Sequence, residues 1–492
     1  MAGSRMLSFI HLDQAFPAKR PAQDRAQDFD EISTSFLTAK AEEQASRCSQ
    51  CGVPFCQVHC PLENHIPDWL KLAAEGRLRD AYELSASTST MPEICGRICP
   101  QDRLCEGSCV IEQSGHGSVT IGSVEKFLTD TAWKEGWVEP LQPLADRSGQ
   151  SVGIIGAGPA GLTAAELLRR RGYSVHVYDR HDRAGGLLIY GIPGFKLEKP
   201  VVERRVKRLA DGGVNFHLST EIGRDISFAE LRRRHDAILV ATGVYKPRPL
   251  GLAGAELPGV VKALDYLIAS NRVGLGDQVP AYESGELNAL GRHVVVIGGG
   301  DTAMDCVRTA VRQGAASVTC LYRRDKANMP GSAREVQNAE EEGVEFQWLA
   351  APAAFEPGAN GHVASVRALR MRLGAPDASG RRAPEPEPGS DFHLQADLVV
   401  EALGFDPEDL PAAFQQPDLA VTRWGTLKAQ AERLSTSLPG VFAAGDIVRG
   451  ASLVVWAMRE GRDVARAMHA WLQAQAPETA AQPHAKALKE PA

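Results

Sequence analysis

Two glycine-rich turns, each between an apolar strand and the start of a helix, constrain the fold of this chain most. The first lies in Ser151–Glu166 (SVGIIGAGPAGLTAAE) and the second in His293–Ala303 (HVVVIGGGDTA). Such strand–turn–helix units belong to parallel α/β sheets in which the helix N-terminus faces a phosphate. The turns begin 142 residues apart, which is too long for a solenoid repeat. The sequence therefore predicts two similar α/β domains.

The first turn has the glycines that a dinucleotide site needs. Gly156 permits the tight turn, Gly158 lets the backbone approach a pyrophosphate, and Gly161 allows close packing of helix on strand. The next strand ends at Asp179, 18 residues after Gly161, where a carboxylate can accept hydrogen bonds from ribose hydroxyls. We interpret this unit as a dinucleotide site; a glycine turn without a ligand is the alternative.

Two later segments favour FAD as the ligand of the first turn. Arg183-Ala-Gly-Gly-Leu187 follows the acid closely, as in flavoproteins with two dinucleotide domains. Near the end of the chain a strand runs into Gly445-Asp446, and a helix from about Ser452 to Trp471 would direct its positive end at the flavin. A simple turn is the alternative for Asp446. The predicted FAD contacts are Gly156, Gly158, Pro159, Ala160, Gly161, Asp179, Arg183, Gly185, Gly186, Leu187, Thr242, Gly243, Gly445 and Asp446.

The second turn is followed by a different charge. Arg323 and Arg324 stand at the end of the strand Ser317–Tyr322, where a ribose-binding acid would otherwise lie. Arginine pairs with a 2′-phosphate, whereas an acid repels it, so we predict NADPH rather than NADH. A solvated basic turn is the alternative. The predicted NADPH contacts are Gly298, Gly299, Gly300, Asp301, Thr302, Ala303, Arg323 and Arg324.

Eight of the ten cysteines lie between Cys48 and Cys109, in two groups. The spacings are C-x2-C-x4-C-x3-C-P from Cys48 and C-x3-C-P-x5-C-x3-C from Cys95. In a reducing cytosol such density indicates metal binding rather than disulfides, and Cys-Pro runs are typical of iron–sulfur clusters. Zinc is the alternative for the cysteines alone. Two sites for redox cofactors in the same chain favour iron–sulfur clusters, because a flavin reduced by hydride needs an acceptor that takes electrons one at a time. Cys306 and Cys320 are interpreted as packed thiols.

These patterns predict an α/β fold with a helical N-terminal iron–sulfur domain and two Rossmann-like domains. The expected divisions are 1–145 for the helical domain, 146–245 and 405–472 for the FAD domain, 246–404 for an NADPH domain inserted in it, and 473–492 for a disordered tail. Helices are expected over Arg25–Arg47, Ile66–Gly76, Arg77–Ser87 and Val119–Glu135, and a surface loop over Ala375–Ser390.

Net charge and hydropathy limit the classes of partner that this chain can have. The formal net charge of −7 argues against a nucleic-acid binder. The N-terminal segment has no sustained apolar run, and no stretch is suited to a membrane span. We therefore expect a soluble, cytoplasmic chain without nucleic-acid or membrane partners.

The cysteine-rich head, followed by G-A-G-P-A-G, A-G-G-L-L, G-G-G-D-T-A and A-A-G-D, carries a resemblance over almost the whole chain. It resembles the small (β) subunits of NADPH-dependent glutamate synthase. It is also similar to the N-terminal half of dihydropyrimidine dehydrogenase and, in the nucleotide domains, to adrenodoxin-reductase-like enzymes. The segments Tyr190–Lys196 and Gly298–Asp305 look like that family in detail.

The resemblance implies two 4Fe–4S clusters with crossed ligation. One would use Cys48, Cys51, Cys56 and Cys109. The other would use Cys60, Cys99 and Cys105 with a non-cysteine ligand, for which Glu125 is the matching position. Cys95 would then be free. By chemistry alone Cys95 is the better ligand, because a cluster prefers thiolate, so it remains the alternative.

The resemblance also implies a reaction. NADPH would reduce FAD, and electrons would pass through the clusters to a large (α) subunit that carries FMN and makes glutamate from glutamine and 2-oxoglutarate. The chain would then work in a hetero-oligomer and need no catalytic side chain of its own. An NADPH:ferredoxin-type oxidoreductase, an input subunit for another large partner, and a zinc-stabilised interaction module are the alternatives.

Overall fold

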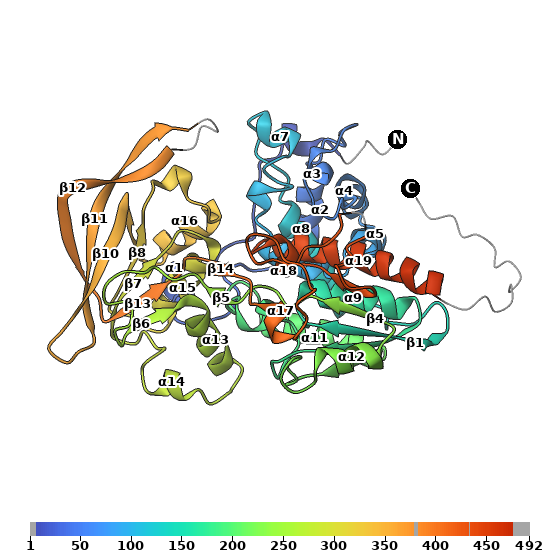
Figure 1. Cartoon of the computed structure of the whole chain (residues 1–492). Coiled ribbons are helices and arrows are strands. Elements are labelled where there is room, and N and C mark those ends of the chain that lie inside the picture. Colours follow the sequence, from blue (N-terminus) through green and yellow to red (C-terminus); the bar gives the residue numbers. More distant parts are fainter. Residues whose placement is uncertain (1–5, 378–381, 432, 476–492) are drawn as a thin grey trace, which may run out of the picture.

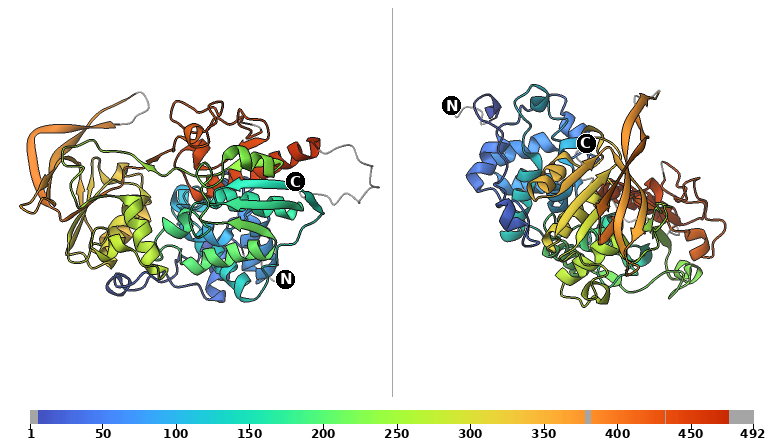
Figure 2. Two further views of the ribbon diagram at one scale, coloured as in Figure 1. Left: turned by 60° about the horizontal axis from the view of Figure 1, so that its bottom comes forward. Right: turned by 90° about the vertical axis from the view of Figure 1, so that its left-hand side faces the viewer.

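The computed structural model describes residues 6–377, 382–431 and 433–475 and has the predicted α/β class. A helical region, blue in Figure 1, lies above the first α/β unit, and the second α/β unit lies beside them with a long antiparallel hairpin on its outer side. Figure 2 shows an N-terminal arm leaving the helical region and running along the second unit.

The described part of the N-terminal region contains helices and no named strand before β1 (Arg147–Ile155). Within α4, Ile66, Trp69, Leu70 and Ala73 recur at helical spacing and are buried, so one face joins the core. The helices in chain order are α1 (Ala22–Arg25), α2 (Thr38–Ala45), α3 (Phe55–Val58), α4 (Ile66–Ala74), α5 (Leu78–Thr88), α6 (Pro92–Ile98), α7 (Val110–Gln113) and α8 (Ile121–Lys134), with 3₁₀ turns at Ser8–Ile10 and Gln101–Arg103.

The expected helices at α4, α5 and α8 are confirmed, whereas the helix predicted over Arg25–Arg47 is wrong. Only the last residue of α1 and the helix α2 are helical there, and the residues before α2 belong to an irregular arm, residues 12–37, that includes the short helix α1. The arm folds back on itself, because the Arg20 N–H donates to the Ile32 carbonyl and the Thr34 N–H to the Ala18 carbonyl. Its side chains serve other parts of the molecule: buried Arg25 donates to Glu342 at 3.0 Å. Long-range pairing therefore replaces the local helix.

The first α/β sheet has the order β15-β4-β1-β2-β3, and all its neighbouring strands are parallel. Its further strands are β2 (Tyr173–Tyr178), β3 (Val214–His217), β4 (Ala237–Val240) and β15 (Val441–Ala443). Its helices are α9 (Pro159–Arg170), α10 (Leu187–Tyr190), α11 (Lys199–Asp211), α12 (Phe228–Arg234), α17 (Leu410–Ala413), α18 (Asp446–Arg449) and α19 (Val454–Gln475). The chain thus returns to this sheet after an excursion of about two hundred residues between β4 and β15.

The excursion forms the second sheet, with the order β6-β13-β7-β8-β9 and again only parallel neighbours. The strands are β6 (Val260–Lys262), β7 (His293–Ile297), β8 (Ser317–Tyr322), β9 (Glu345–Trp348) and β13 (Leu398–Glu401); the helices are α13 (Ala263–Gly274), α14 (Pro280–Glu283), α15 (Asp301–Arg312) and α16 (Ala333–Glu341), with a 3₁₀ turn at Lys326–Asn328. The two crossings between the units pair as β5 (Lys246–Pro247) and β14 (Phe405–Asp406).

The surface loop predicted over Ala375–Ser390 is wrong, because strands occupy most of that range. The third sheet consists of β10 (Ala350–Pro357), β11 (Val363–Pro376) and β12 (Arg382–Gln395), all antiparallel. Proline normally excludes a segment from a sheet, but β12 is an edge strand and tolerates the missing N–H groups of Pro384, Pro386 and Pro388. The proline-rich composition therefore indicated an edge rather than a loop.

The helical region and the first α/β unit share one hydrophobic core. Leu62, Met91 and Ile94 of the helical region join the same buried cluster as Val152 of β1 and Met458 of α19.

The last helix continues to Gln475, three residues into the range predicted as a disordered tail, and the rest of that range lies outside the described residues. Among the residues described, no helix has both the length and the apolar character needed to cross a membrane.

Candidate functional site

The first glycine turn is built as the sequence predicts. A Cβ at Gly156 would lie 2.3 Å from the Ala241 carbonyl oxygen, and one at Gly161 would lie 2.0 Å from the Gly156 oxygen. A Cβ at Gly158 would meet nothing within 4 Å, so this position faces open space above the start of α9. The turn therefore leaves room for a pyrophosphate where the backbone N–H groups of the helix end point.

A cavity of about 110 Å³ adjoins this turn, and its wall contains Gly156, Asp179 and Thr242. The Asp179 carboxylate accepts from the Ala157 N–H at 2.7 Å and from the His181 N–H at 2.9 Å, which braces the turn. The Thr242 hydroxyl oxygen is buried and has no hydrogen-bond partner within the described structure. An unsatisfied buried hydroxyl beside a cavity suits a ligand that supplies the partner. These features are compatible with the ADP part of FAD.

Two segments distant in sequence close around the first turn. A Cβ at Gly186 would lie 2.9 Å from the Gly158 Cα, and one at Gly445 would lie 3.1 Å from the Ala160 Cβ. Asp446 accepts from the Ser452 hydroxyl at 2.8 Å, and burial raises its pKa above the usual range. The structure thus brings together the predicted contacts around Gly158, Gly186 and Gly445.

Arg183 was predicted to contact FAD, but in the structure its guanidinium pairs with a carboxylate of the second α/β unit. Its guanidinium makes two hydrogen bonds of 2.8 Å to the Asp277 carboxylate, and it also donates to the Tyr190 hydroxyl at 3.2 Å. Asp277 lies just after α13 of the second unit, so this pair joins the two α/β units. Leu187 begins the short helix α10 directly after Gly186, and Gly243 lies against the Tyr245 ring.

The second glycine turn repeats the first. A Cβ at Gly298 would lie 2.3 Å from the Ala402 oxygen, and one at Gly300 would meet nothing within 4 Å. The helix α15 begins at Asp301, whose carboxylate accepts from the Ser332 N–H at 2.9 Å. Thr302 and Ala303 lie in the first turn of that helix, and the ring of Tyr322 closes over Gly299.

The two arginines lie at the end of β8, beside the second turn. Arg323 is exposed, whereas Arg324 is half-buried and donates to the Tyr322 hydroxyl at 3.1 Å. An exposed guanidinium at the end of the second strand is available to a 2′-phosphate.

Cys48, Cys51, Cys56 and Cys109 form the first of two cysteine groups that the fold assembles. Burial, together with the neighbouring thiols of Cys48, Cys109 and Cys51, raises the pKa of the Cys56 thiol to about 12. Cys109 directly precedes α7, so this thiol comes from a segment about fifty residues away from the other three. The four thiols predicted for one cluster therefore lie within electrostatic reach of one another.

The second group surrounds a small cavity lined by Cys60, Cys95, Cys99, Cys105 and Glu125. Glu125 accepts from the Ser85 hydroxyl at 3.2 Å, and burial raises its pKa to about 8. The Cys95 sulfur contacts the Met458 sulfur at 3.8 Å and lies 3.9 Å from the Ser89 hydroxyl. Both candidates for the fourth ligand thus reach the cavity, and a set of three thiols plus one of them suits a cluster.

Among the residues that the structure describes, no group of three or more His, Cys, Asp or Glu side chains is arranged to hold a single metal ion. The two cysteines outside the groups, Cys306 and Cys320, are fully buried, as expected for packed thiols.

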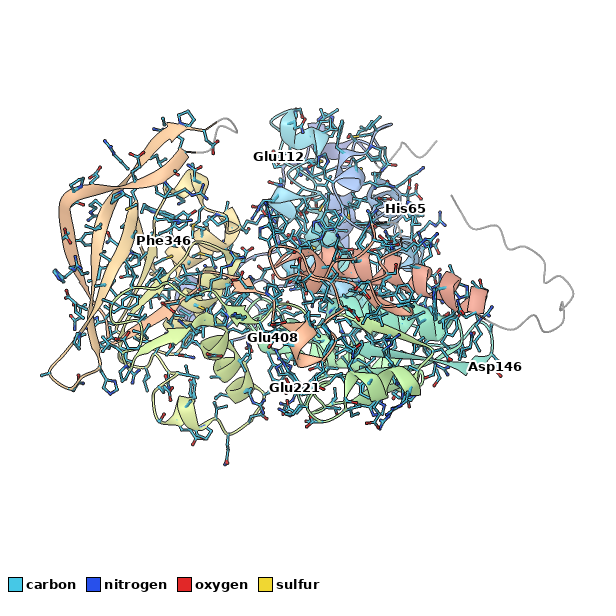
Figure 3. All side chains as sticks on the ribbon, in the orientation of Figure 1. His65, Glu112, Asp146, Glu221, Phe346 and Glu408 are labelled. Carbon is cyan, nitrogen blue, oxygen red and sulfur yellow. The ribbon has the colours of Figure 1, made fainter. Side chains whose placement is uncertain are left out.

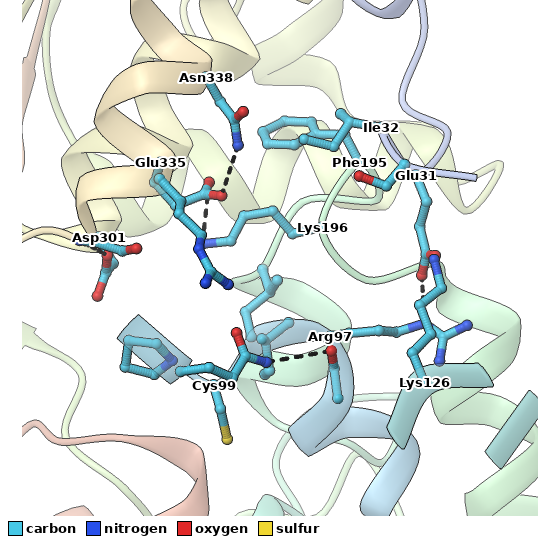
Figure 4. A pocket seen from close by; sticks show the side chains of 18 of the residues that line it. Glu31, Ile32, Arg97, Cys99, Lys126, Phe195, Lys196, Asp301, Glu335 and Asn338 are labelled. Atoms are coloured by element: carbon cyan, nitrogen blue, oxygen red, sulfur yellow. Dashed lines mark hydrogen bonds and ion pairs between the residues drawn. The ribbon is translucent and has the colours of Figure 1, made fainter. Parts of the chain in front are cut away.

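A cavity of about 530 Å³ lies where the N-terminal arm, the helical region and the two α/β units meet (Figure 4). The helical region contributes Arg97, Cys99 and Lys126; the first unit contributes Phe195, Lys196 and Leu453; the second unit contributes Asp301, Asp305 and Glu335; and the arm contributes Glu31 and Ile32. Cys99 also lines the cavity of the second cysteine group. This space connects the start of α15, the start of α19 and the cysteines.

Several lining residues were not predicted. Lys196 binds Asp305 at 2.9 Å across the two α/β units, although it ends a segment already noted for its likeness to the family. Arg180 lies 4.8 Å above the Tyr245 ring beside the first turn, and Glu221 and Glu408 complete that cavity wall (Figure 3). The position of Arg180 directly after Asp179 was a usable signal. Glu408 lies far away in sequence, and only the fold brings it there.

Comparisons with known proteins agree with this geometry. Residues 25–137 match the family described as dihydropyrimidine dehydrogenase domain II, 4Fe-4S cluster, and residues 150–461 match the pyridine nucleotide-disulphide oxidoreductase family. The glutamate synthase [NADPH] small chain of Azospirillum brasilense is 66% identical over 476 residues, which is 97% of this chain and 98% of that protein. The chain belongs to the glutamate synthase small-chain family.

Another member of the glutamate synthase small-chain family, from Escherichia coli K12, is 46% identical over 94% of this chain and 98% of its own length. The structure of Mycobacterium tuberculosis FprA in complex with NADPH shares the fold of the nucleotide-binding part, with a TM-score of 0.56 and 20% identity over 66% of this chain and 85% of that chain. The chain is therefore a pyridine-nucleotide oxidoreductase with a domain of the 4Fe–4S type.

Proposed function

We propose that this chain, an NADPH-dependent oxidoreductase that carries FAD and 4Fe–4S clusters, is the electron-input subunit of a glutamate synthase. Its partner would be a large chain that carries FMN and forms glutamate from glutamine and 2-oxoglutarate. One observation carries the proposal: the 530 Å³ cavity joins the start of α15, directly after the second glycine turn, to the start of α19 and to Cys99 of the second cysteine group. Bound NADPH and FAD supply hydride transfer, and the clusters supply one-electron transfer.

The residues of this chain hold and orient these groups. In the proposal, 146–245 with 405–472 forms the FAD-binding unit and 246–404 the NADPH-binding unit, while 1–145 holds the clusters. Placement is the main contribution, because a correctly oriented pair of reactants needs no further acid or base. The ion pair between Lys196 and Asp305 joins the two nucleotide units at the cavity wall, which keeps their relative orientation.

The two cysteine groups extend from the cavity towards the surface. Cys99 of the second group lines the cavity, and Cys105 of that group lies within electrostatic reach of Cys56 of the first group. Above the first group, Val53 is 61% exposed, Phe55 44% and Val58 61%. Exposed apolar side chains beside a redox centre suit a protein partner. We assign this surface to the large chain. A reducing cytoplasm suits the free thiols.

The test is anaerobic reconstitution with the large chain. The complex should form glutamate from glutamine, 2-oxoglutarate and NADPH, whereas this chain alone should only reduce artificial acceptors. Val58→Glu should weaken the complex and spare NADPH oxidation with an artificial acceptor. Leu290→Glu is the matched control, because Leu290 is 70% exposed but lies in the second unit. Acceptor reduction without glutamate formation in the wild-type complex would instead favour an input subunit for another partner.

The cluster ligands need a separate experiment. We propose Cys48, Cys51, Cys56 and Cys109 for one cluster, and Cys60, Cys99, Cys105 and Glu125 for the other. Iron and acid-labile sulfide per chain should fall by about half in Glu125→Ala and stay unchanged in Cys95→Ala. The reverse result would transfer the fourth position to Cys95. A protein that binds zinc and no iron would end the proposal altogether.

A further inference from the structure

A second polar pocket lies between the helical region and the first α/β unit, away from both glycine turns. It has a volume of about 70 Å³ and is lined by the end of α5, by α9 and α11, and by Met458 and Arg462 of α19. A water molecule takes about 30 Å³ in the liquid, so the pocket accommodates a few waters or one small ion.

The charge of the pocket is positive. Four arginines line it, namely Arg170, Arg205, Arg208 and Arg462, and Glu166 is the one carboxylate among the described lining residues. Glu166 accepts from Arg208 at 3.0 Å and pairs with Arg170 at 3.3 Å, so one negative charge is shared by two guanidinium groups. Outside the wall, Glu93 binds Arg205 through two bonds of 2.7 and 2.8 Å. Asp463, also outside the wall, lies 3.5 Å from the Arg462 guanidinium and is shared with Arg459 at 3.1 Å. One positive charge of the four arginines therefore remains after these three carboxylates are counted.

The wall also supplies neutral donors. The Thr88 hydroxyl oxygen is buried and has no partner within the described structure. The hydroxyls of Thr90 and Thr163 lie 2.9 Å apart across the interface, and Tyr82 completes this side. Hydroxyl and guanidinium donors converging on a small space are the chemistry that binds oxyanions.

We propose that this pocket binds one small tetrahedral oxyanion, with inorganic phosphate as the probe. The ion connects α5 of the helical region with α9, α11 and α19 of the first unit. Ser89 is in the pocket wall and lies 3.9 Å from the Cys95 sulfur, while Met458 in the same wall contacts that sulfur. The site therefore stabilises the junction beside the second cysteine group.

The helix α19 offers a matched pair of variants. Arg462 donates to the Leu62 carbonyl at 3.0 Å and the Thr88 carbonyl at 3.4 Å and lines the pocket. Arg459 donates to the neighbouring Pro61 carbonyl at 2.7 Å and is absent from the pocket wall. Both substitutions remove one positive charge and contacts to the helical region, but only Arg462→Met removes a pocket donor.

The experiment is equilibrium dialysis of the anaerobically purified holoprotein with radiolabelled phosphate, at constant ionic strength and with saturating NADP⁺ to occupy the nucleotide site. Wild type and Arg459→Met should bind one phosphate per chain, and Arg462→Met should bind at least about tenfold more weakly. Sulfate should compete, and chloride should not. Phosphate should also raise the melting temperature by on the order of 2 °C in the first two proteins only.

Three results would overturn the proposal: no phosphate retained by wild type, equal binding by both variants, or an equal response to chloride. The second would mean that Arg462 only joins the two parts of the molecule. If Arg462→Met fails to fold, Arg208→Gln replaces it, because Arg208 contributes another pocket donor from α11. Retained binding in that variant would count against the site equally.

Discussion

The two α/β units repeat one architecture with different charges at the same place. In each sheet the strand before the glycine turn lies between the strand that follows it and a later strand, so β1 corresponds to β7 and β2 to β8. In each turn a Cβ added to the first glycine would lie 2.3 Å from a backbone carbonyl oxygen. The third residue of each turn is also a glycine, and a Cβ added there would meet nothing within 4 Å.

The units differ at the end of the second strand. Asp179 follows β2, and its carboxylate accepts a hydrogen bond from the Ala157 N–H of the glycine turn, so the acid braces that turn. Arg323 follows β8 and is exposed, while Asp301 inside the second turn binds the Ser332 N–H instead. The comparison teaches that the same glycine geometry builds both turns, and we propose that the residue after the next strand selects the nucleotide.

The largest expected effects come from the first glycine of each turn. Both have positive φ, 107° at Gly156 and 142° at Gly298, and both have a carbonyl where a Cβ would lie. Gly156→Ala should destabilise the first unit by about 2–4 kcal/mol and lose most of the bound flavin. Gly298→Ala should keep its flavin and lose NADPH binding. Flavin absorbance per chain and titration with NADPH check both.

Gly158→Ala is the control for the cradle itself. Its φ is −79° and its Cβ would meet nothing, so the fold should keep its stability in urea. The methyl group would occupy the space kept for the pyrophosphate, and flavin binding should weaken without unfolding. A Gly158→Ala protein with normal flavin content would contradict the FAD assignment of this turn.

The next effect concerns the choice between NADPH and NADH. Arg323→Ala should raise KM for NADPH by about 10–100-fold, because it removes charge-assisted hydrogen bonds worth about 1.5–3 kcal/mol, and it should leave KM for NADH unchanged. Lys326→Ala is the matched control, since Lys326 is a nearby exposed cation paired with Glu340 at 2.7 Å. Equal losses for both nucleotides in Arg323→Ala would remove the selectivity argument.

The sequence predicted those features of the fold that depend on residues close together in the chain. Glycine spacing and strand periodicity located both turns, because local geometry determines them. Cysteine spacing located the cysteine-rich segments, but the crossed sets, in which Cys109 joins Cys48 from a distant segment, were implied only by the family resemblance. The sequence could not predict the N-terminal arm, where Arg25, the last residue of the short helix α1, binds Glu342 more than three hundred residues away. Nor could it place Glu408 beside Arg180, an ion pair of 2.8 Å between residues on either side of the inserted unit. Such contacts depend on how the units pack.

The third prediction uses a histidine cluster that the second sheet lacks among its described strands. His235 bonds the Tyr178 hydroxyl at 2.9 Å and the Ser151 hydroxyl at 2.6 Å, and His176 and His217 lie 3.0 Å apart beside it. Burial, together with the neighbouring His176 and His217, lowers the pKa of His235 to about 4. The folded unit therefore resists protonation at a pH where the unfolded chain accepts it.

In the second unit the buried acid Glu342 has a lower pKa than His235 of the first unit. Burial works towards a raised pKa, but hydrogen bonds from Arg308 and Arg312 hold the pKa of Glu342 at about 2. An acid with a depressed pKa loses its contribution only as pH falls from about 4.5 towards 2. A histidine with a depressed pKa loses its contribution as pH falls from about 6.5 towards 4. The first unit should thus fail first on acidification.

Flavin release on acidification measures this difference directly. Between pH 6.5 and 4 the wild type should lose on the order of 2 kcal/mol of stability in the first unit, seen as a lower urea midpoint for flavin release. His235→Gln should flatten this dependence, because the glutamine side chain does not titrate. His293→Gln is the matched control, since His293 begins β7 of the second unit and its ring lies 2.8 Å from the Ser317 hydroxyl of β8. An unchanged pH profile in His235→Gln would show that the cluster does not set the acid limit of the first unit.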